Sequence, residues 1–170
     1  MDKLFEKIYD ENYTMIYRYF YYMTGNNHLS EDLTADTFLK AYRFLSGYDE
    51  KKAGIGTWLM IIAKNTYTDH MRKNKIQVYV GDDTLSDIPE RDDPFSHVFS
   101  DERDKMLYAA IGKLKESERN LIAMKYSAEL KNREIAKIIG KSERHTAVML
   151  CRTLAKLKKI LNEMGVYDYE

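Results

Sequence analysis

The fold of this chain is decided by Asn132–Leu150, which reads NREIAKIIGKSERHTAVML. Ile135 and Ala136 fall on one helical face before Gly140, and Ser142 can cap a second helix two residues after the glycine. The glycine supplies the positive φ of a tight turn, and the small alanine lets two helices cross closely. The spacing predicts a helix-turn-helix, although an ordinary helical hairpin with a glycine C-cap has the same pattern.

The charge around this motif favours a polyanion as its partner. The net charge of the whole chain is zero, yet residues 105–164 hold fourteen Lys or Arg against six Glu, a net +8. Residues 81–104 have the opposite sign, with nine acids against two arginines, a net −7. Basic helix-turn-helix domains dock on double-stranded DNA through contacts to its phosphates. We therefore expect the C-terminal part of the chain to bind duplex DNA.

The start of the second helix of the motif is expected to face the major groove. Arginine can read guanine there through paired donors, whereas Val148 and Met149 can reach only the methyl groups of thymine. Solvated surface is the simpler interpretation of each lone basic side chain. The predicted DNA-binding residues of the motif are Lys141, Ser142, Glu143, Arg144, His145, Val148, Met149, Arg152 and Lys156.

Apolar periodicity predicts three helices ahead of the acidic segment. The first ends at Gly25, the second begins at a capping Ser30, and the third begins at Thr57. The periodicity disappears over residues 80–100, which contain both prolines, and Ser117 is expected to cap a later helix. We expect an all-α fold of two small helical domains. The predicted parts are a domain at 1–79, a flexible acidic linker at 80–104, and the helix-turn-helix domain at 105–170.

Enzyme and membrane functions find little support in the sequence. The four histidines are scattered, and the carboxylates of residues 31–36 lack the set of His or Cys ligands that would complete a metal site. Gly54 and Gly56 lack the third glycine and the preceding strand of a dinucleotide-binding loop. We expect no catalytic residue, no metal and no cofactor. The single Cys151 and the short apolar runs favour a cytoplasmic protein without membrane insertion.

The third predicted helix interleaves aromatic and cationic side chains. Such a surface can hold single-stranded nucleic acid, because unpaired bases stack on aromatic rings while cations follow the backbone. Core packing is the simpler interpretation of Trp58, which lies beside Ile61 and Ile62, and composition alone favours it. The candidate nucleic-acid-binding residues of this helix are Trp58, Lys64, Asn65, Tyr67, His70, Arg72 and Lys73.

Three further blocks, in order, make the chain recognisable. Residues 30–42 read SEDLTADTFLKAY, residues 56–65 read GTWLMIIAKN, and residues 69–72 read DHMR, all ahead of the basic helix-turn-helix. Together they resemble bacterial sigma factors of the extracytoplasmic-function (ECF) group of the sigma-70 family. The resemblance covers nearly the whole chain. It implies a factor that binds core RNA polymerase and directs promoter recognition and opening.

The resemblance also implies a partner for each surface. The second helix is expected to grip the clamp helices of the largest polymerase subunit, and the third helix to bind the minus-ten promoter element. The helix-turn-helix would bind the minus-thirty-five element; the flap of the second polymerase subunit and an anti-sigma factor are further expected partners. The carboxylates of Asp32 and Asp36 share a helical face and suit cationic partner side chains, with a solvated face as the alternative. The expected core-binding residues are Asp32, Leu33, Asp36, Thr37, Phe38 and Tyr42.

One stretch departs from the pattern of the family. Members commonly carry cations at the positions occupied here by residues 145–149, whereas this chain has an apolar run, Ala147–Cys151. Either the motif reads an unusual, thymine-rich element through apolar contacts, or the run docks a protein such as an anti-sigma factor. Two other functions stay open: a sigma-like DNA-binding regulator that acts without polymerase, and a protein-interaction module.

Overall fold

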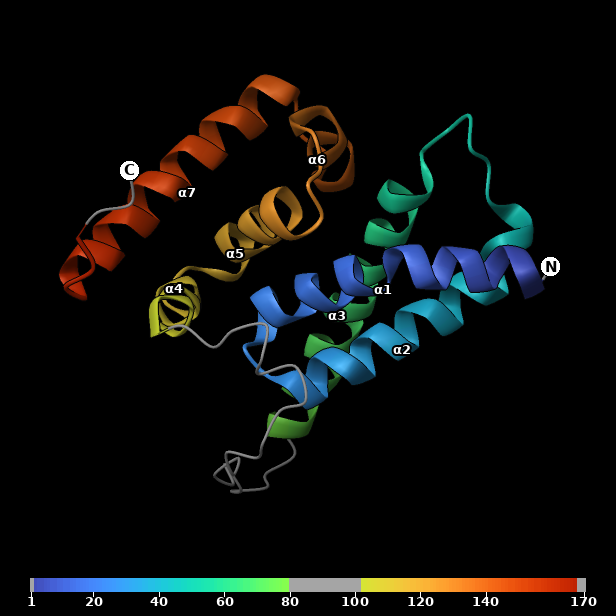
Figure 1. The fold of residues 1–170 in the computed structure, drawn as a ribbon, viewed down its shortest axis with the longest axis horizontal. Coiled ribbons are helices and arrows are strands. Elements are labelled where there is room, and N and C mark those ends of the chain that lie inside the picture. Colours follow the sequence, from blue (N-terminus) through green and yellow to red (C-terminus); the bar gives the residue numbers. More distant parts are fainter. Residues whose placement is uncertain (1, 80–101, 168–170) are drawn as a thin grey trace.

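The computed structural model describes residues 2–79 and 102–167, in which every regular element is helical (Figure 1). The predicted all-α fold of two helical domains is confirmed. The predicted linker lies outside the described residues, except that its last three residues already belong to a helix that begins at Glu102. The first domain contains α1 (Asp2–Thr24), α2 (Asn27–Phe44), the 3-10 turn η1 (Leu45–Gly47) and α3 (Ile55–Tyr79). The second contains α4 (Glu102–Gly112), α5 (Glu116–Ile122), the π-helical turn η3 (Ala123–Ser127), α6 (Asn132–Ile139) and α7 (Glu143–Glu163).

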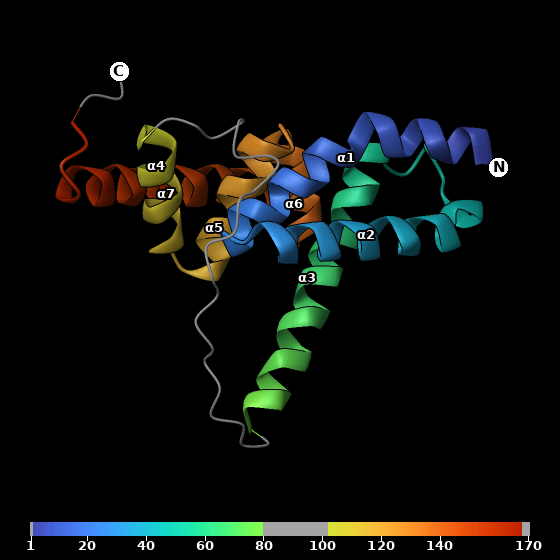
Figure 2. The same cartoon turned by 60° about the horizontal axis from the view of Figure 1, so that its bottom comes forward.

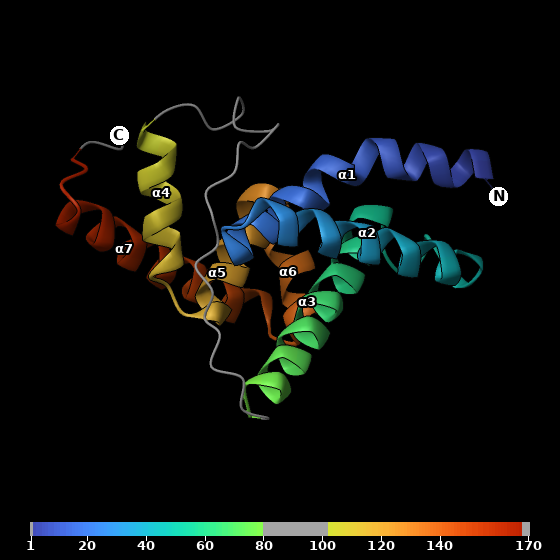
Figure 3. The same ribbon diagram turned by 90° about the horizontal axis from the view of Figure 1, so that it is seen from below.

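In the first domain α1 and α2 lie side by side, and α3 crosses them (Figures 1 and 3). Apolar side chains from all three helices, including Phe20, Leu33 and Leu59, are buried where the helices meet. The C-terminal part of α3 projects away from the other helices (Figure 2). Arg72 and Lys73 on this part are exposed. The projecting part is therefore accessible to a partner.

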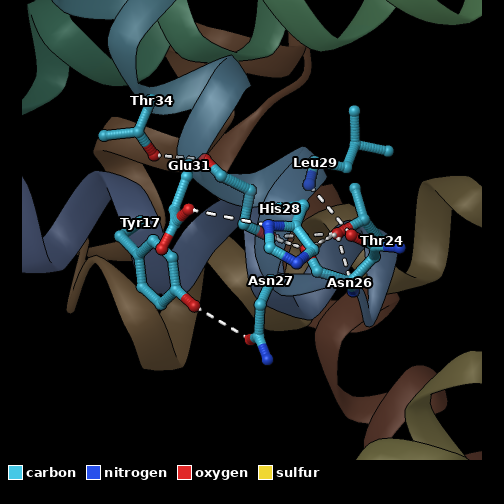
Figure 4. A network of polar contacts seen from close by, with 9 residues as sticks. Tyr17, Thr24, Asn26, Asn27, His28, Leu29, Glu31 and Thr34 are labelled. Atoms are coloured by element: carbon cyan, nitrogen blue, oxygen red, sulfur yellow. Dashed lines mark hydrogen bonds and ion pairs between the residues drawn. The ribbon is translucent and has the colours of Figure 1, made fainter. Parts of the chain in front are cut away.

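The turn between α1 and α2 is capped by Asn26, so the prediction that Ser30 caps the second helix was wrong (Figure 4). Gly25 ends α1 with a φ of 62°. Asn26 Oδ1 then accepts a hydrogen bond from the backbone N–H of Leu29 at 2.9 Å. Ser30 lies inside the helix, is buried, and donates to the carbonyl of Asn26 at 2.6 Å. Because Asn26 already serves the free amides, α2 begins a turn earlier than expected.

The predicted helix-turn-helix is formed by α6 and α7. Gly140 ends α6 in the left-handed region with a φ of 68°. The Ser142 hydroxyl accepts a hydrogen bond from the backbone N–H of His145 at 3.1 Å, which caps α7 as predicted. Ile135 and Leu150 are buried and fill the angle between the two helices. The local sequence pattern therefore fixed both the turn and the start of α7.

A different residue from the predicted Ser117 occupies the cap of α5. The helix begins at Glu116 with Lys115 at the cap position. The backbone N–H of Lys115 donates to the carboxylate of Glu118 at 2.9 Å. A glutamate three residues after the cap can satisfy the cap amide from within the helix, so the serine hydroxyl is not needed there.

The two domains share one hydrophobic core. Apolar residues of the first domain, such as Ile16 and Phe20, belong to the same buried cluster as Met124 and Ile135 of the second. Helix α1 packs against α4, α5 and η3, and α3 packs against α6. We call this contact of α1 and α3 with the second domain the domain interface. The sequence predicted two domains but did not predict that they pack against each other.

Candidate polymerase and nucleic-acid interfaces

The α2 helix presents its carboxylates to solvent and buries the apolar residues beside them. Asp32 and Asp36 are exposed, and the exposed fraction of Tyr42 is 39%. Three other residues that were expected to contact polymerase, Leu33, Thr37 and Phe38, are buried in the core, with Thr37 Oγ1 donating to the carbonyl of Leu33 at 2.7 Å. The helical face of these three packs against α1 and α3 in this structure, and their direct contact with polymerase stays a prediction.

Aromatic rings join the outer face of α2 to α1. The Phe38 ring lies 4.7 Å from the ring of Tyr9, and the Tyr42 ring lies edge-on to Phe5 at 5.0 Å between centroids. The sequence prediction missed two exposed apolar residues on the same helix, Leu39 and Phe44, whose exposed fractions are 50% and 62%. Leu39 lies on the helical face opposite the buried Ala41, which could have marked it as exposed, whereas Phe44, the last residue of the helix, carries no such signal. The surface of α2 is therefore both acidic and apolar.

On α3 the two aromatic candidates have packing roles. Tyr67 is 4% exposed, and burial raises its pKa, with the charge of Glu116 adding to the effect. The ring of Tyr67 lies inside the fold in this structure, and its contact with a base stays a prediction. Trp58 is half-buried, and its ring lies 5.0 Å from that of Tyr48. In place of the expected aromatic platform, this part of α3 offers one partly accessible indole.

The polar candidates on α3 lie mostly on its accessible side. Asn65 and Lys73 are exposed, as is Arg72, whose guanidinium pairs with Asp69 at 3.1 Å. The ring of His70 lies 2.7 Å from the side-chain amide of Asn74. Lys64 differs from these residues, because it is half-buried at the domain interface. A nucleic acid can therefore reach the projecting half of the helix more readily than its first half.

In the helix-turn-helix most predicted DNA contacts are at the surface. Exposed side chains line the turn and the first turns of α7: Lys141, Ser142, Glu143, Arg144, His145, Val148 and Arg152. The apolar run Ala147–Cys151 is not exposed as a whole, because Leu150 is buried and Met149 is half-buried. Val148 is 44% exposed. Three residues of the run, Ala147, Val148 and Cys151, are thus exposed, and Val148 is the largest apolar side chain among them.

Lys156 pairs within the domain, which weakens the prediction that it contacts a phosphate. Its ammonium lies 2.7 Å from the Glu118 carboxylate. This hydrogen bond, together with the one from the Lys115 backbone, holds the pKa of Glu118 below its usual value. The pair ties α7 to the first turn of α5. In this structure the Lys156 ammonium therefore stabilises the packing of α7 on α5.

An apolar groove opens between α4 and α7 and extends to α1. Its volume is about 570 Å³, within the range of roughly 300–1,000 Å³ that is common for binding pockets. The sequence prediction missed this groove, whose walls include Leu154, an exposed member of the leucine repeat on α7. The lining residues are Tyr22, Leu107, Ile111, Ile122, Tyr126, Leu154, Leu157, Lys158, Leu161, Asn162 and Tyr167.

Two kinds of site are not found in residues 2–79 and 102–167. No three His, Cys, Asp or Glu side chains in these ranges are grouped so that they could hold a metal ion. None of the helices formed by these residues has the length and apolar character that crossing a bilayer requires.

Both domains match family models of bacterial transcription factors. Residues 8–76 match sigma-70 region 2, and residues 104–157 match sigma-70 region 4. The ECF RNA polymerase sigma factor SigM of Bacillus subtilis is 30% identical over 165 residues, which cover 96% of this chain and 98% of SigM. The chain belongs to the ECF group of sigma-70 family sigma factors. It is a sigma factor that acts with RNA polymerase in transcription initiation.

Two further comparisons agree with this membership. The ECF RNA polymerase sigma factor SigW of Bacillus subtilis is 30% identical over 145 residues, covering 80% of this sigma factor and 77% of SigW. The sigma factor RpoE of Bartonella quintana, solved in complex with the anti-sigma factor NepR, has the same fold. Its TM-score is 0.78 at 18% identity, over 94% of this chain and 98% of that chain. The shared fold extends over both helical domains.

Proposed function

We propose that this sigma factor binds promoter DNA through two surfaces, on α3 and on α7, and polymerase through two others, the acidic face of α2 and the groove between α4 and α7. Residues 1–79 act as region 2 and residues 105–170 as region 4, with residues 80–104 as the linker between them. The factor works in the cytoplasm and carries no catalytic centre of its own, since polymerase performs the chemistry. The observation that carries this proposal is an exposed acidic face on α2 and an exposed, basic start of α7 in one chain.

The acidic face of α2 is the proposed contact to the clamp helices of the largest polymerase subunit. Asp32 and Asp36 lie one helical turn apart and are exposed, so both carboxylates can pair with cations of one partner helix. Leu39 and Tyr42 offer apolar surface beside them. The buried Phe38 fixes the position of this face through its packing on Tyr9.

The accessible side of α3 is the proposed minus-ten contact. Asn65, Arg72 and Lys73 are exposed for backbone and base contacts, and the half-buried Trp58 and His70 offer partial ring surface. Extruding an unpaired base costs a few kcal/mol, which stacking and pocket contacts of about 1–3 kcal/mol per base offset without ATP. Lys64 can join these residues only when the domain interface opens.

The start of α7 is the proposed minus-thirty-five contact. Arg144 and Arg152 are exposed and lie two turns apart on the helix, where arginine can read guanine or bind phosphate. Val148 lies between them and is exposed, so it can contact a thymine methyl group. Lys141 and the cap residue Ser142 lie at the helix N-terminus, which favours a phosphate.

The apolar groove between α4 and α7 is the proposed site for the polymerase flap. A groove of this shape accepts the apolar face of a partner helix, with anchors spaced three and four residues apart. Lys158 and Asn162 at its rim can contact polar groups of that helix. An anti-sigma factor is a further proposed partner, since the Bartonella quintana sigma factor is described in complex with one.

Run-off transcription with purified host core polymerase and a pool of genomic promoters tests the proposal. We expect specific transcripts only when the chain is added. Core polymerase alone and core polymerase with the Arg144→Ala/Arg152→Ala variant are the controls, and the variant should initiate at fewer promoters. If no transcript depends on the chain while the chain alone binds duplex DNA with a steep salt dependence, it is instead a regulator that acts without polymerase.

A further inference from the structure

The groove between α4 and α7 is apolar at its floor and polar at its mouth. Helix α4 lies across the C-terminal half of α7, and the groove of about 570 Å³ opens beside this crossing (Figure 2). Aliphatic lining residues are buried and form the floor: Ile111, Ile122, Leu157 and Leu161. Lining residues with polar side chains are exposed and form the mouth: Tyr126, Lys158, Asn162 and Tyr167. The polarity of the groove therefore changes with depth.

Lys158 at the mouth differs from the neighbouring lysines of α7. The Lys156 ammonium pairs with Glu118 at 2.7 Å, and that of Lys159 lies 3.9 Å from Glu163. Lys158 forms no ion pair or hydrogen bond through its side chain with any residue in the described ranges 2–79 and 102–167. Its ammonium therefore keeps three free donors beside the apolar floor.

The lining of the groove carries no negative charge to balance this cation. None of the described residues that line it is Asp or Glu. Tyr22, on the α1 side of the groove, has a pKa above its ordinary value, first because of its burial, so its phenol is neutral at pH 7. The amide of Asn162, one helical turn after Lys158, can donate to the same acceptor. The mouth therefore suits an anionic group.

The size of the groove favours a small ligand. Its volume lies within the roughly 300–1,000 Å³ of small-molecule sites, which are mostly apolar and orient their ligand through a few polar groups. A flexible hydrocarbon chain can follow a floor built from several helices, whereas an anionic head group at its end remains near the solvent and Lys158. One molecule that joins these two chemistries is an amphiphile with a single chain.

We propose that this groove binds a single-chain amphiphile with an anionic head group, of which a fatty acid is the simplest, with the chain on the buried aliphatic floor and the head group on Lys158. The site is separate from the surfaces assigned to DNA on α3 and at the start of α7. It is the same groove that was assigned to the polymerase flap, so ligand and flap would exclude each other. That consequence, unlike the ligand site, rests on the function proposed above.

Titration calorimetry of the full chain with monomeric fatty acids tests the ligand site. We expect saturable binding of one decanoate per chain, with an affinity that rises about four-fold for each methylene between octanoate and dodecanoate. Decyl phosphate in a parallel titration shows whether the mouth prefers a phosphate or a carboxylate head group, and saturable binding of either supports the proposal. Binding that does not saturate would mean general adsorption to the protein surface and would overturn it.

A matched pair of lysine variants tests the position of the head group. We expect Lys158→Gln to weaken decanoate binding about five-fold, because it removes one charge-assisted contact at an exposed position. The binding of 1-decanol, which has the same chain and a neutral head, should be the same in this variant and in the unsubstituted chain. Lys159→Gln is the control, since Lys159 does not line the groove, and it should bind decanoate normally. Equal losses in both variants would contradict the assigned site.

Leu154→Trp tests the position of the hydrocarbon chain. Leu154 lines the groove and is 37% exposed, so a larger side chain can fill the groove without entering the core. We expect this variant to keep its native circular dichroism and to lose at least 90% of its affinity for decanoate and for 1-decanol alike. Undiminished binding by the folded variant would place the ligand elsewhere and overturn the proposal.

A competition experiment separates this inference from the proposed function. Fluorescence anisotropy of the labelled chain measures its affinity for core polymerase with and without saturating dodecanoate, and we expect the ligand to weaken it at least five-fold. If the ligand binds as expected but the affinity for polymerase is unchanged, the flap assignment of the groove fails and the ligand site stands. If no fatty acid binds, the ligand site fails, whatever the affinity for polymerase.

Discussion

At Gly140 the backbone adopts a φ of 68°, and no heavy atom lies within 4 Å of where a Cβ would be. A substitution there is therefore a test of backbone strain without a steric clash. We expect Gly140→Ala to lower the free energy of unfolding by about 1 kcal/mol, because an L-residue pays for the left-handed conformation. Urea unfolding followed by circular dichroism measures this. Gly47→Ala, at a glycine that also has open space but no positive φ, should cost nothing.

The Glu118 carboxylate makes stability depend on pH. Its pKa in the folded chain lies below the usual 4.5, first because Lys156 donates a hydrogen bond to it. A depressed folded pKa means that the contribution is fully present above about pH 5.5 and is lost as the pH falls through the folded value. We expect Glu118→Gln to lower the free energy of unfolding at pH 7 by about 0.5–1 kcal/mol, with the difference vanishing toward pH 3.

Urea unfolding across this pH range checks the prediction. Glu116→Gln, which removes a carboxylate from the same turn of α5 without removing either contact to Lys115 and Lys156, is the control. It should show a smaller loss at pH 7. Identical pH profiles for Glu118→Gln and the unsubstituted chain would mean that the pair contributes nothing.

The sequence predicted helix ends and caps correctly where only one nearby residue could supply the conformation or the acceptor that the backbone needs. Gly25, Gly140 and Ser142 end or cap their helices as expected, because each supplies a conformation or an acceptor that no neighbour offers. Ser30 and Ser117 were misjudged for the opposite reason. Both helices begin before the serine, at Asn27 and Glu116, and the side chains of Asn26 and Glu118 serve amides of the earlier start. Sequence alone does not rank such competing starts.

At the scale of one element, α2 has exposed residues that are available to a partner and buried residues that stabilise the fold. The carboxylates of Asp32 and Asp36 are exposed, so their removal should cost partner contacts and little stability. We expect Asp32→Ala/Asp36→Ala to weaken core polymerase binding at least ten-fold with the unfolding midpoint nearly unchanged, measured by fluorescence anisotropy of the labelled chain. Glu6→Ala/Asp10→Ala removes an exposed acid pair of the same spacing from α1 and should bind normally. Equal losses in both variants would indicate a general charge effect.

The sequence predicted the α3 helix, but it predicted the burial of the side chains on that helix only in part. The sequence placed the start of the helix within two residues of Ile55, and Asn65, Arg72 and Lys73 are exposed, but the helix continues past these cations to Tyr79. The burial of Tyr67 was not predicted, because it depends on α5, whose Arg119 and Glu116 lie near its hydroxyl. Helical periodicity describes one helix, and it does not reveal which further helix covers its polar face.

At the scale of the whole molecule, the packing of one domain on the other could not be predicted from the sequence. One hydrogen bond across the domain interface joins Tyr19 to Asn120, which are 101 residues apart in the sequence. Nothing local to either residue marks it: Tyr19 lies on an apolar stripe that α2 and α3 could also have covered, and Asn120 lies in a polar stretch of α5. The groove between α4 and α7 also has no local signal in the sequence, because its lining residues come from five separate elements, α1, α4, α5, η3 and α7.

The shared core predicts that the two domains unfold together. The chain supplies a probe in each domain, since its one tryptophan, Trp58, lies in α3 and its one cysteine, Cys151, is exposed on α7. We expect Trp58 fluorescence and a fluorophore on Cys151 to report the same urea midpoint, because the buried cluster couples the domains into one cooperative unit.

Met124→Ala tests this coupling from inside the shared cluster. Met124 is fully buried in η3, and truncating such a side chain costs about 2–5 kcal/mol. If the domains are coupled, both probes should move to the same lower midpoint, although the substitution is in the second domain. Leu161→Ala, in a separate buried cluster at the end of α7, is a second test of the coupling and should also lower the urea midpoint that Trp58 reports. A Trp58 midpoint that stays fixed in both variants would show that the first domain is stable without the second. The domain interface would then be a weak contact between independently folding domains.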